Sequence, residues 1–478
     1  MRWLVVALAV CACSAPAAAP DAPGASDATV WSTCAGDPRA TPESLAAKAA
    51  AYDARVLGLH VHPQMPWVLD VAIASGVDPE TATVNDVVAW RSGENDGLWS
   101  SLVLAAEAYR FAATHDPAAR EALATLLHGE QLRMQITGVP GLFTRQLIPP
   151  GVAGIACPAD PAAYTPSPNK TSNVWVRIDA GGCANGTSHC GLSQFAGWCF
   201  LDNVSQDEYV GHMFALGAVA HLVDDPALHA IAVDLLSQIG HHLVANHMEF
   251  VDWDGRPTQW GKVHPDAPGG DSPGYLAVLG ASFLATAADG TGDPDLAAAY
   301  AQLGYASYLD QIAVWPGGDN CTANWNDLSM LAASFHDVIA SDPANRATWQ
   351  AGFGSALVGM PKGLLVEHNA WWDLLWADST PDPAVVEDAA CALREFPRSN
   401  HVVARMATAA TACTGRFDEP LAATPFSIAD RCAATYAWWG NPYSMQTCAA
   451  DPTLVQNPAG YLLPYWMARY HGFLGPSD

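Results

Sequence analysis

The sequence predicts an all-α protein, a closed ring of six helical hairpins. Three observations support this fold class: five Asp-Pro pairs each follow one helical run and open another, the first run of each pair is apolar on nearly every side, and neither end of the series resembles a polar cap. An open helical solenoid needs polar caps, because its terminal repeats expose a face that internal repeats bury. We therefore favour a closed ring over an open solenoid.

The Asp-Pro pairs mark where the outer helices begin. Asp caps the free N–H groups of a helix start, and Pro suits the first helical position, where its missing N–H costs nothing. The pairs are Asp116-Pro117, Asp225-Pro226, Asp293-Pro294, Asp342-Pro343 and Asp382-Pro383. The inner helices before them are expected over residues 98–114, 209–223, 275–288, 328–340 and 371–378. Their uniform apolar character indicates burial on both sides, whereas the runs over 118–135 and 227–246 carry charge on one face.

The two ends of the chain supply the sixth hairpin. Residues 42–57 form an amphipathic helix of the outer type, and residues 458–473 form an apolar, aromatic helix of the inner type. Residues 138–203 form a long loop rich in Gly, Pro and Cys, with a strand-like run at 174–178, and residues 249–260 are typical of a β-hairpin. Loops of this length in a compact domain usually carry function. We expect one domain over residues 41–478.

The amino terminus predicts export. Residues 1–13 place one Arg before an apolar run that is too short to span a bilayer. Val10-Cys11-Ala12-Cys13 has the form of a bacterial lipobox with Cys13 as the lipidated residue, and a plain secretory signal is the alternative. Residues 14–40 are expected to form a flexible tether. The protein is then a bacterial cell-envelope lipoprotein or a secreted protein, with the lipid as its only membrane contact.

Charge and cysteine content restrict the partners. The chain has 48 Asp and Glu against 21 Lys and Arg, a formal net charge of −27, which disfavours nucleic acid and anionic lipid. If Cys11 is removed with the signal and Cys13 carries the lipid, ten cysteines remain. In an exported protein these ten predict up to five disulfides. Cys183/Cys190 and Cys432/Cys448 are plausible local bridges, and a zinc site is the competing interpretation.

Carboxylates gather where the inner helices begin. In a closed ring these helices run in one direction, so their N-termini meet on one face. Helix capping explains one acid per start but not two acids close together, as at residues 94–96 and 207–208. The candidate catalytic residues are Asp207, Asp96, Glu208, Glu94, His212 and Tyr209. The candidate substrate-binding residues are Asn95, Trp99, Trp260, Asn324, Trp325, Asn326, Glu367, His368, Trp371 and Trp372.

Three segments carry a resemblance to a known superfamily. SGENDGLWSSLVLAAEAYRF (92–111), SQDEYVGHMFALG (205–217) and VDWDGRPTQWG (251–261) resemble parts of six-hairpin (α/α)6-toroid proteins, which include glycoside hydrolases and polysaccharide lyases. The resemblance covers residues 42–473 and implies a carbohydrate substrate. Glycosidic hydrolysis needs a proton donor and a second carboxylate as base or nucleophile. We expect Asp207 to be the first such group and Asp96 the second.

Other interpretations stay open at this point. A polysaccharide lyase would use Tyr209 and His212 as its base, with Arg145, Arg177 or Arg256 neutralising a uronate. A non-catalytic glycan- or protein-binding lipoprotein would use the same face. No cofactor is expected, apart from Ca²⁺ as one interpretation of the Asp252/Asp254 pair, for which a β-turn is the alternative.

Overall fold

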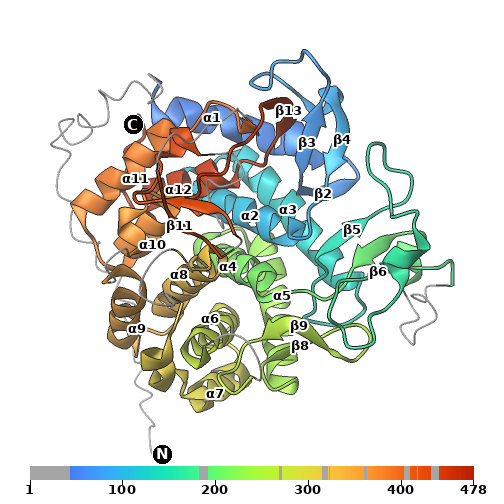
Figure 1. Cartoon of the computed structure of the whole chain (residues 1–478). Helices are drawn as coiled ribbons and strands as arrows, with labels where there is room; N and C mark the ends of the chain where they lie inside the picture. The colour runs from blue at the N-terminus through green and yellow to red at the C-terminus, as the bar shows by residue number, and fades with distance from the viewer. Residues whose placement is uncertain are drawn as a thin grey trace, which may run out of the picture.

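The computed structural model describes residues 43–181, 192–267, 272–314, 321, 323–359, 363–402, 410–416, 418–431 and 441–478. In these residues, α-helices alternate between an inner and an outer layer (Figure 1). The inner helices are α2 (Asp96–Thr114), α4 (Gln206–Leu222), α6 (Pro273–Thr291), α8 (Trp325–Ser341), α10 (Ala370–Ser379) and α12 (Ala459–Tyr470). The outer helices are α1 (Leu45–Arg55), α3 (Pro117–Gln135), α5 (Pro226–Ala245), α7 (Pro294–Leu303), α9 (Arg346–Phe353) and α11 (Pro383–Glu395).

The inner helices form a closed ring. Each inner helix contacts the next one along the chain, and α12 contacts α2. Each of α2, α4, α6, α8 and α10 packs against the outer helix that follows it, and α1 packs against α12. The chain is therefore an (α/α)6 toroid, and the predicted sixth hairpin between the two ends of the sequence is confirmed.

Helix α1 closes the outer layer through donors on one of its faces. Lys48, Tyr52 and Arg55 lie at helical spacing and donate hydrogen bonds over 2.6–3.1 Å to backbone carbonyls at the end of α11 and just beyond it. The acceptors are the carbonyls of Leu393, Arg394, Phe396, Pro397 and Arg398. Because carbonyls at a helix end lack partners within the helix, these contacts satisfy them.

Four of the five Asp-Pro pairs cap helices as predicted. In each, the Asp side chain accepts a hydrogen bond from a backbone N–H in the first turn; these residues are Asp116, Asp225, Asp293 and Asp382. The prediction for Asp342 is wrong, because α9 begins only at Arg346. The Asp342 carboxylate instead accepts hydrogen bonds from the Tyr300 hydroxyl at 2.6 Å and Trp349 Nε1 at 3.0 Å, which ties outer helices to the end of α8.

Short strands add to the helical ring. The predicted hairpin is confirmed as β8 (Glu249–Val251) with β9 (Pro257–Lys262), and the predicted strand as β6 (Trp175–Arg177), which pairs with β7 (Cys199–Leu201). β7 also pairs with β5 (Gln146–Ile148). Smaller pairs are β1 (Val61–His62) with β2 (Met65–Val68) and β11 (Thr411–Thr414) with β12 (Pro420–Ala422).

The sequence did not predict a four-stranded antiparallel sheet, ordered β10-β13-β3-β4. It consists of β3 (Asp70–Ile73), β4 (Val87–Arg91), β10 (His401–Val402) and β13 (Asp451–Val455). Its strands have two to five residues, and β13 pairs with β3 across nearly the whole chain. Strands this short that pair over such a separation leave little local signal.

Disulfides join loops to this framework. Cys157 bonds Cys199 of β7, and Cys321 bonds Cys413 of β11. Cys391 and Cys448 are also disulfide-bonded. Cys13, Cys183, Cys190 and Cys432 lie outside the described residues. Among the described helices, none has the length and apolar character needed to cross a bilayer.

The caps predict a defined loss of stability. Asp382→Ala removes the acceptor for the Ala384 N–H, now bonded at 3.0 Å, and should lower the free energy of unfolding by about 1 kcal/mol. Asp382→Asn keeps a side-chain oxygen in place and should retain most of that stability. Urea unfolding of the two variants measures both free energies. Equal losses of stability in Asp382→Ala and Asp382→Asn would contradict the capping role.

Candidate functional site

The candidate site lies where α2 and α4 begin side by side. Asn95 Nδ2 donates to Asp207 Oδ2 over 2.6 Å, and the backbone N–H of Leu98 donates to Glu208 Oε2 over 2.9 Å. The structure thus brings together the acids at residues 94–96 and 207–208.

Two glycines permit this close approach. A Cβ atom at Gly97 would lie 2.2 Å from Glu208 Oε2, and one at Gly211 would lie 2.6 Å from Leu98 Cδ1. Both contacts are closer than real Cβ atoms tolerate. A side chain at Gly97 would displace the Glu208 carboxylate, and one at Gly211 would press on Leu98 of α2.

Asp96 is a buried carboxyl group at the first position of α2. It accepts hydrogen bonds from the Ser92 hydroxyl and, over 2.7 Å, from the Gly93 N–H. Burial raises the pKa of Asp96 to about 7, and this effect outweighs the opposing influence of Arg133 and the two donors. Near neutral pH, Asp96 can therefore hold or release a proton.

Asp207 has a different environment. Its carboxylate accepts hydrogen bonds from Asn95 Nδ2 and the Ser205 hydroxyl. Arg145 orients both donors, with Nη2 2.6 Å from Asn95 Oδ1 and Nη1 2.6 Å from Ser205 Oγ. Its Nε donates to the Glu94 carbonyl over 3.0 Å. Sequence reasoning connected Arg145 only with a uronate, because nothing local to residue 145 shows which segments it joins.

Glu94 is the open member of the group. Its side chain is 69% exposed, and Asn173 Nδ2 donates to its Oε2 over 3.2 Å. A solute arriving at this end of the ring would therefore meet Glu94 before the two buried aspartates.

Glu208 and His212 lie beneath these residues in the core between helices, where both are fully buried. Burial raises the pKa of Glu208 well above its usual range. His212 Nδ1 lies 2.5 Å from Glu130 Oε2 and 2.8 Å from Ser101 Oγ, while its ring stacks on Phe143 at 3.9 Å. In this geometry neither side chain faces solvent, which differs from the predicted catalytic position.

Tyr209 also belongs to the core. Its hydroxyl donates to the Gly141 carbonyl over 2.7 Å and accepts from the Phe143 N–H at 3.1 Å, and its ring stacks on Phe250. Both functions of the hydroxyl are thus occupied by backbone of the long loop. The Tyr209/His212 base that a lyase would need is closed off in this structure.

The predicted aromatic binding surface is mostly interior. Trp325, Trp371 and Trp372 are buried, with Trp325 stacked on Trp372 at 5.7 Å and Trp371 edge-on to Phe214. They differ from the expectation because neighbouring inner helices pack over them. Trp99 is half-buried against the core.

Trp260 of β9 is the predicted aromatic that stays open, 51% exposed. Its strand reaches the start of α4, where Gln206 Nε2 donates to the Lys262 carbonyl over 2.7 Å. Trp260 is therefore the aromatic candidate for contact with a solute.

The remaining candidates lie at the starts of α8 and α10. Asn324 immediately precedes α8, and Asn326 is half-buried in its first turn. Glu367 is buried and accepts a hydrogen bond from the Tyr443 hydroxyl at 2.8 Å.

His368 contacts Asp388 at 2.7 Å and Glu395 at 3.3 Å. Burial lowers the pKa of His368, but these two carboxylates outweigh burial and raise it to about 9. The contacts direct His368 toward α11, away from the candidate acids at α2 and α4.

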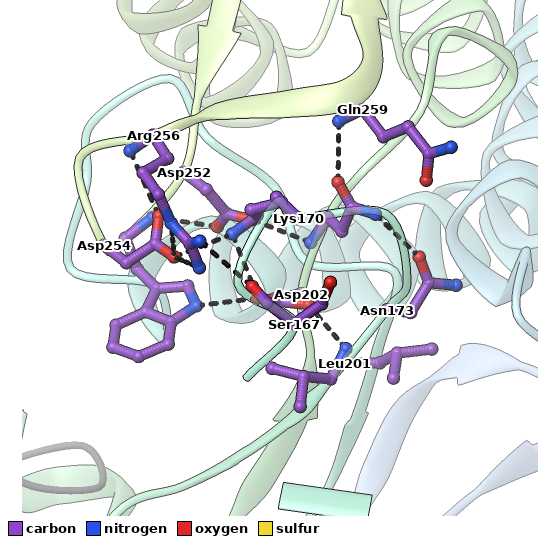
Figure 2. A network of polar contacts seen from close by, with 12 residues as sticks. Ser167, Lys170, Asn173, Leu201, Asp202, Asp252, Asp254, Arg256 and Gln259 are labelled. Atoms are coloured by element: carbon purple, nitrogen blue, oxygen red, sulfur yellow. Dashed lines mark hydrogen bonds and ion pairs between the residues drawn. The ribbon is translucent and has the colours of Figure 1, made fainter. Parts of the chain in front are cut away.

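The Asp252/Asp254 pair faces a protein cation. Figure 2 shows Lys170 among the side chains of Asp202, Asp252 and Asp254. Lys170 Nζ lies 2.8 Å from Asp252, 3.2 Å from Asp254 and 3.0 Å from Asp202. The two carboxylates named for Ca²⁺ are thus both paired with this ammonium group. Within the described ranges, no group of three or more His, Cys, Asp or Glu side chains is arranged to hold a metal ion.

No protein-family model and no curated protein sequence matches the chain. Among solved structures it is similar to a metagenome-derived glycoside hydrolase family 9 endoglucanase (11% identity, TM-score 0.41, 91% of this chain and 80% of that one). It is also similar to an endoglucanase from Alicyclobacillus acidocaldarius (14% identity, TM-score 0.39, 90% of this chain and 84% of that one). A third similar structure is the cellobiose 2-epimerase from Spirochaeta thermophila (11% identity, TM-score 0.37, 90% of this chain and 98% of that one).

The buried Asp96 predicts a pH-dependent stability. Its pKa rises from 3.8 to about 7 on folding, so its contribution is fully present below 3.8 and is lost as the pH rises through about 7. The side chain in Asp96→Asn cannot ionise, so the variant escapes this loss. Thermal unfolding should show the melting temperature of the variant minus that of the wild type increasing from pH 4 to pH 8. The exposed Asp310→Asn serves as the control. A difference that does not change with pH would contradict the assignment.

Proposed function

We propose that this protein is an exported enzyme that cleaves glycosidic bonds, with Asp96 and Asp207 as its acid and base. The observation that carries the proposal is a buried carboxyl group at the start of α2 together with a second carboxylate at the adjoining start of α4. Burial raises the pKa of Asp96 and favours its protonated form, and Asn95, next to Asp96 in the chain, donates a hydrogen bond to Asp207. A carboxyl group that keeps its proton near neutral pH beside a second carboxylate is typical of acid/base catalysis.

The proposed reaction uses both groups. The protonated Asp96 gives its proton to the glycosidic oxygen as the bond to the anomeric carbon breaks. Asp207 either activates a water molecule or attacks that carbon directly, and Arg145 keeps its two donors in place. Glu94 supplies an exposed acceptor for sugar hydroxyls, and Trp260 supplies an exposed aromatic face.

The charge of the site favours a neutral glycan. Glu94 and Asp207 lie close together in a chain whose net charge is −27, and Arg145 is the cation in contact with their segments. A uronate or sulfated chain would be repelled by this field. The occupied Tyr209 hydroxyl also gives no support to a lyase mechanism.

Export and lipid attachment are part of the proposal. They rest on the sequence of residues 1–13, with Cys13 as the lipidated residue. Mass spectrometry of the mature protein from a bacterial host tests the attachment, and an unmodified amino terminus would favour a secreted form.

A glycan panel tests the activity. Reducing ends report hydrolysis, unsaturated uronate absorbance reports a lyase, and retention on a glycan array without product reports a binding protein. Once a substrate is found, Asp207→Asn and Asp96→Asn should each lower kcat by about 10²–10⁴-fold with the fold intact.

Asp224→Asn is the matched control, because Asp224 is exposed at the end of the ring opposite the candidate site. Its activity should equal that of the wild type. Wild-type activity in Asp207→Asn on a confirmed substrate would refute the assignment of this residue.

A further inference from the structure

Lys170 is a buried cation enclosed by three carboxylates from two segments (Figure 2). It lies in the long loop and has φ +51°, Asp202 follows β7, and Asp252 and Asp254 belong to the β8–β9 hairpin. Its ammonium therefore joins the long loop to the hairpin.

The cluster depends on this charge for its balance. Three aspartates face two cations, Lys170 and Arg256. Arg256 is committed to Asp254, with nitrogen–oxygen distances of 2.6 and 2.8 Å, and to the carbonyls of Ser167 and Pro168. Among the described residues, Lys170 is the cation that forms ion pairs with Asp202 and Asp252, and its loss would leave two buried carboxylates unpaired, which is strongly unfavourable.

One of these aspartates holds the chain that leads into the candidate site. Asp252 Oδ2, the atom nearest Lys170, also accepts the Asn203 N–H at 2.7 Å. Asn203 has φ +62°, a conformation that needs such support, and lies four residues before Asp207. Its side chain accepts from the Gln259 N–H and donates to Asn173, which in turn donates to Glu94.

We propose that Lys170 is a positioning residue: its ammonium group takes the place of a structural metal ion and orders the segment from Asn203 to Asp207. The link to turnover rests on the proposed function, whereas the ordering itself does not. The three carboxylates are not arranged around a metal ion while the ammonium lies between them. With the side chain of Lys170 removed, they would be free to close on a divalent cation, and oxygen is the ligand that Ca²⁺ prefers.

Three variants separate charge from packing. Lys170→Met keeps the side-chain volume and removes the charge. Lys170→Gly suits the positive φ and opens space for a cation. Lys170→Met combined with Asp202→Asn removes one positive and one negative group, which restores the net charge of the cluster. Lys262→Met, at a partly exposed lysine of the same hairpin, is the matched control.

The readouts are melting temperature and amide hydrogen exchange of residues 202–207 in the purified chain, so no substrate is needed. Exchange in Lys170→Met should accelerate on the order of a hundredfold. The loss of melting temperature in Lys170→Met should shrink as the pH falls from 8 to 5, because burial raises the pKa of Asp202 and its protonation removes one negative charge from the cluster. Millimolar Ca²⁺ should raise the melting temperature of Lys170→Gly and leave those of the wild type and Lys262→Met unchanged. The double variant should have a higher melting temperature than Lys170→Met.

The proposal would be overturned if Lys170→Met lost the same melting temperature at every pH and Ca²⁺ did not raise that of Lys170→Gly. Lys170 would then be a packing residue. If Lys170→Met does not fold, the double variant and the Ca²⁺ response of Lys170→Gly decide the question. A wild type that is inactive on every glycan would refute the proposed function and leave these readouts intact.

Discussion

The close contact between the starts of α2 and α4 is the constraint on which the site depends. Gly97 and Gly211 let the two helices approach until Glu208 accepts a hydrogen bond from the backbone of α2. That approach brings Asn95 within hydrogen-bonding distance of Asp207. A wider ring would leave the same carboxylates as separate helix caps, each solvated and without a partner across the gap.

Arg145 and Lys170 perform related electrostatic tasks in the segments that lead into this contact. Each comes from the long loop, and each holds polar groups from segments distant in sequence. In a chain with so few basic residues, two of them are placed beside the start of α4. The excess of acid therefore does more than keep the protein soluble, because the position of each rare cation decides which carboxylates are compensated.

The polar core beneath the site contains residues that the sequence predicted to be catalytic but that are buried between helices. Glu208, His212 and Tyr209 follow Asp207 on α4, and sequence reasoning placed all three at the open face. A helix turns by about 100° per residue, so only part of its first turn can face the open end of the ring, while the rest faces neighbouring helices. In the core, Glu208 accepts a hydrogen bond from the Leu98 N–H of α2, His212 contacts Glu130 and Ser101, and Tyr209 bonds the loop backbone.

Local chemistry in the sequence determined the helical framework. Asp-Pro capping and the contrast between apolar and amphipathic runs predicted the ring, the hairpins and the face where acids collect, since both signals act within a few residues. Tertiary structure alone decided the rest: the four-stranded sheet, the turn at Asp342, the burial of the tryptophans, the role of Arg145 and the cage around Lys170. These features depend on which distant segments meet, and burial and hydrogen-bond partners exist only after they have met.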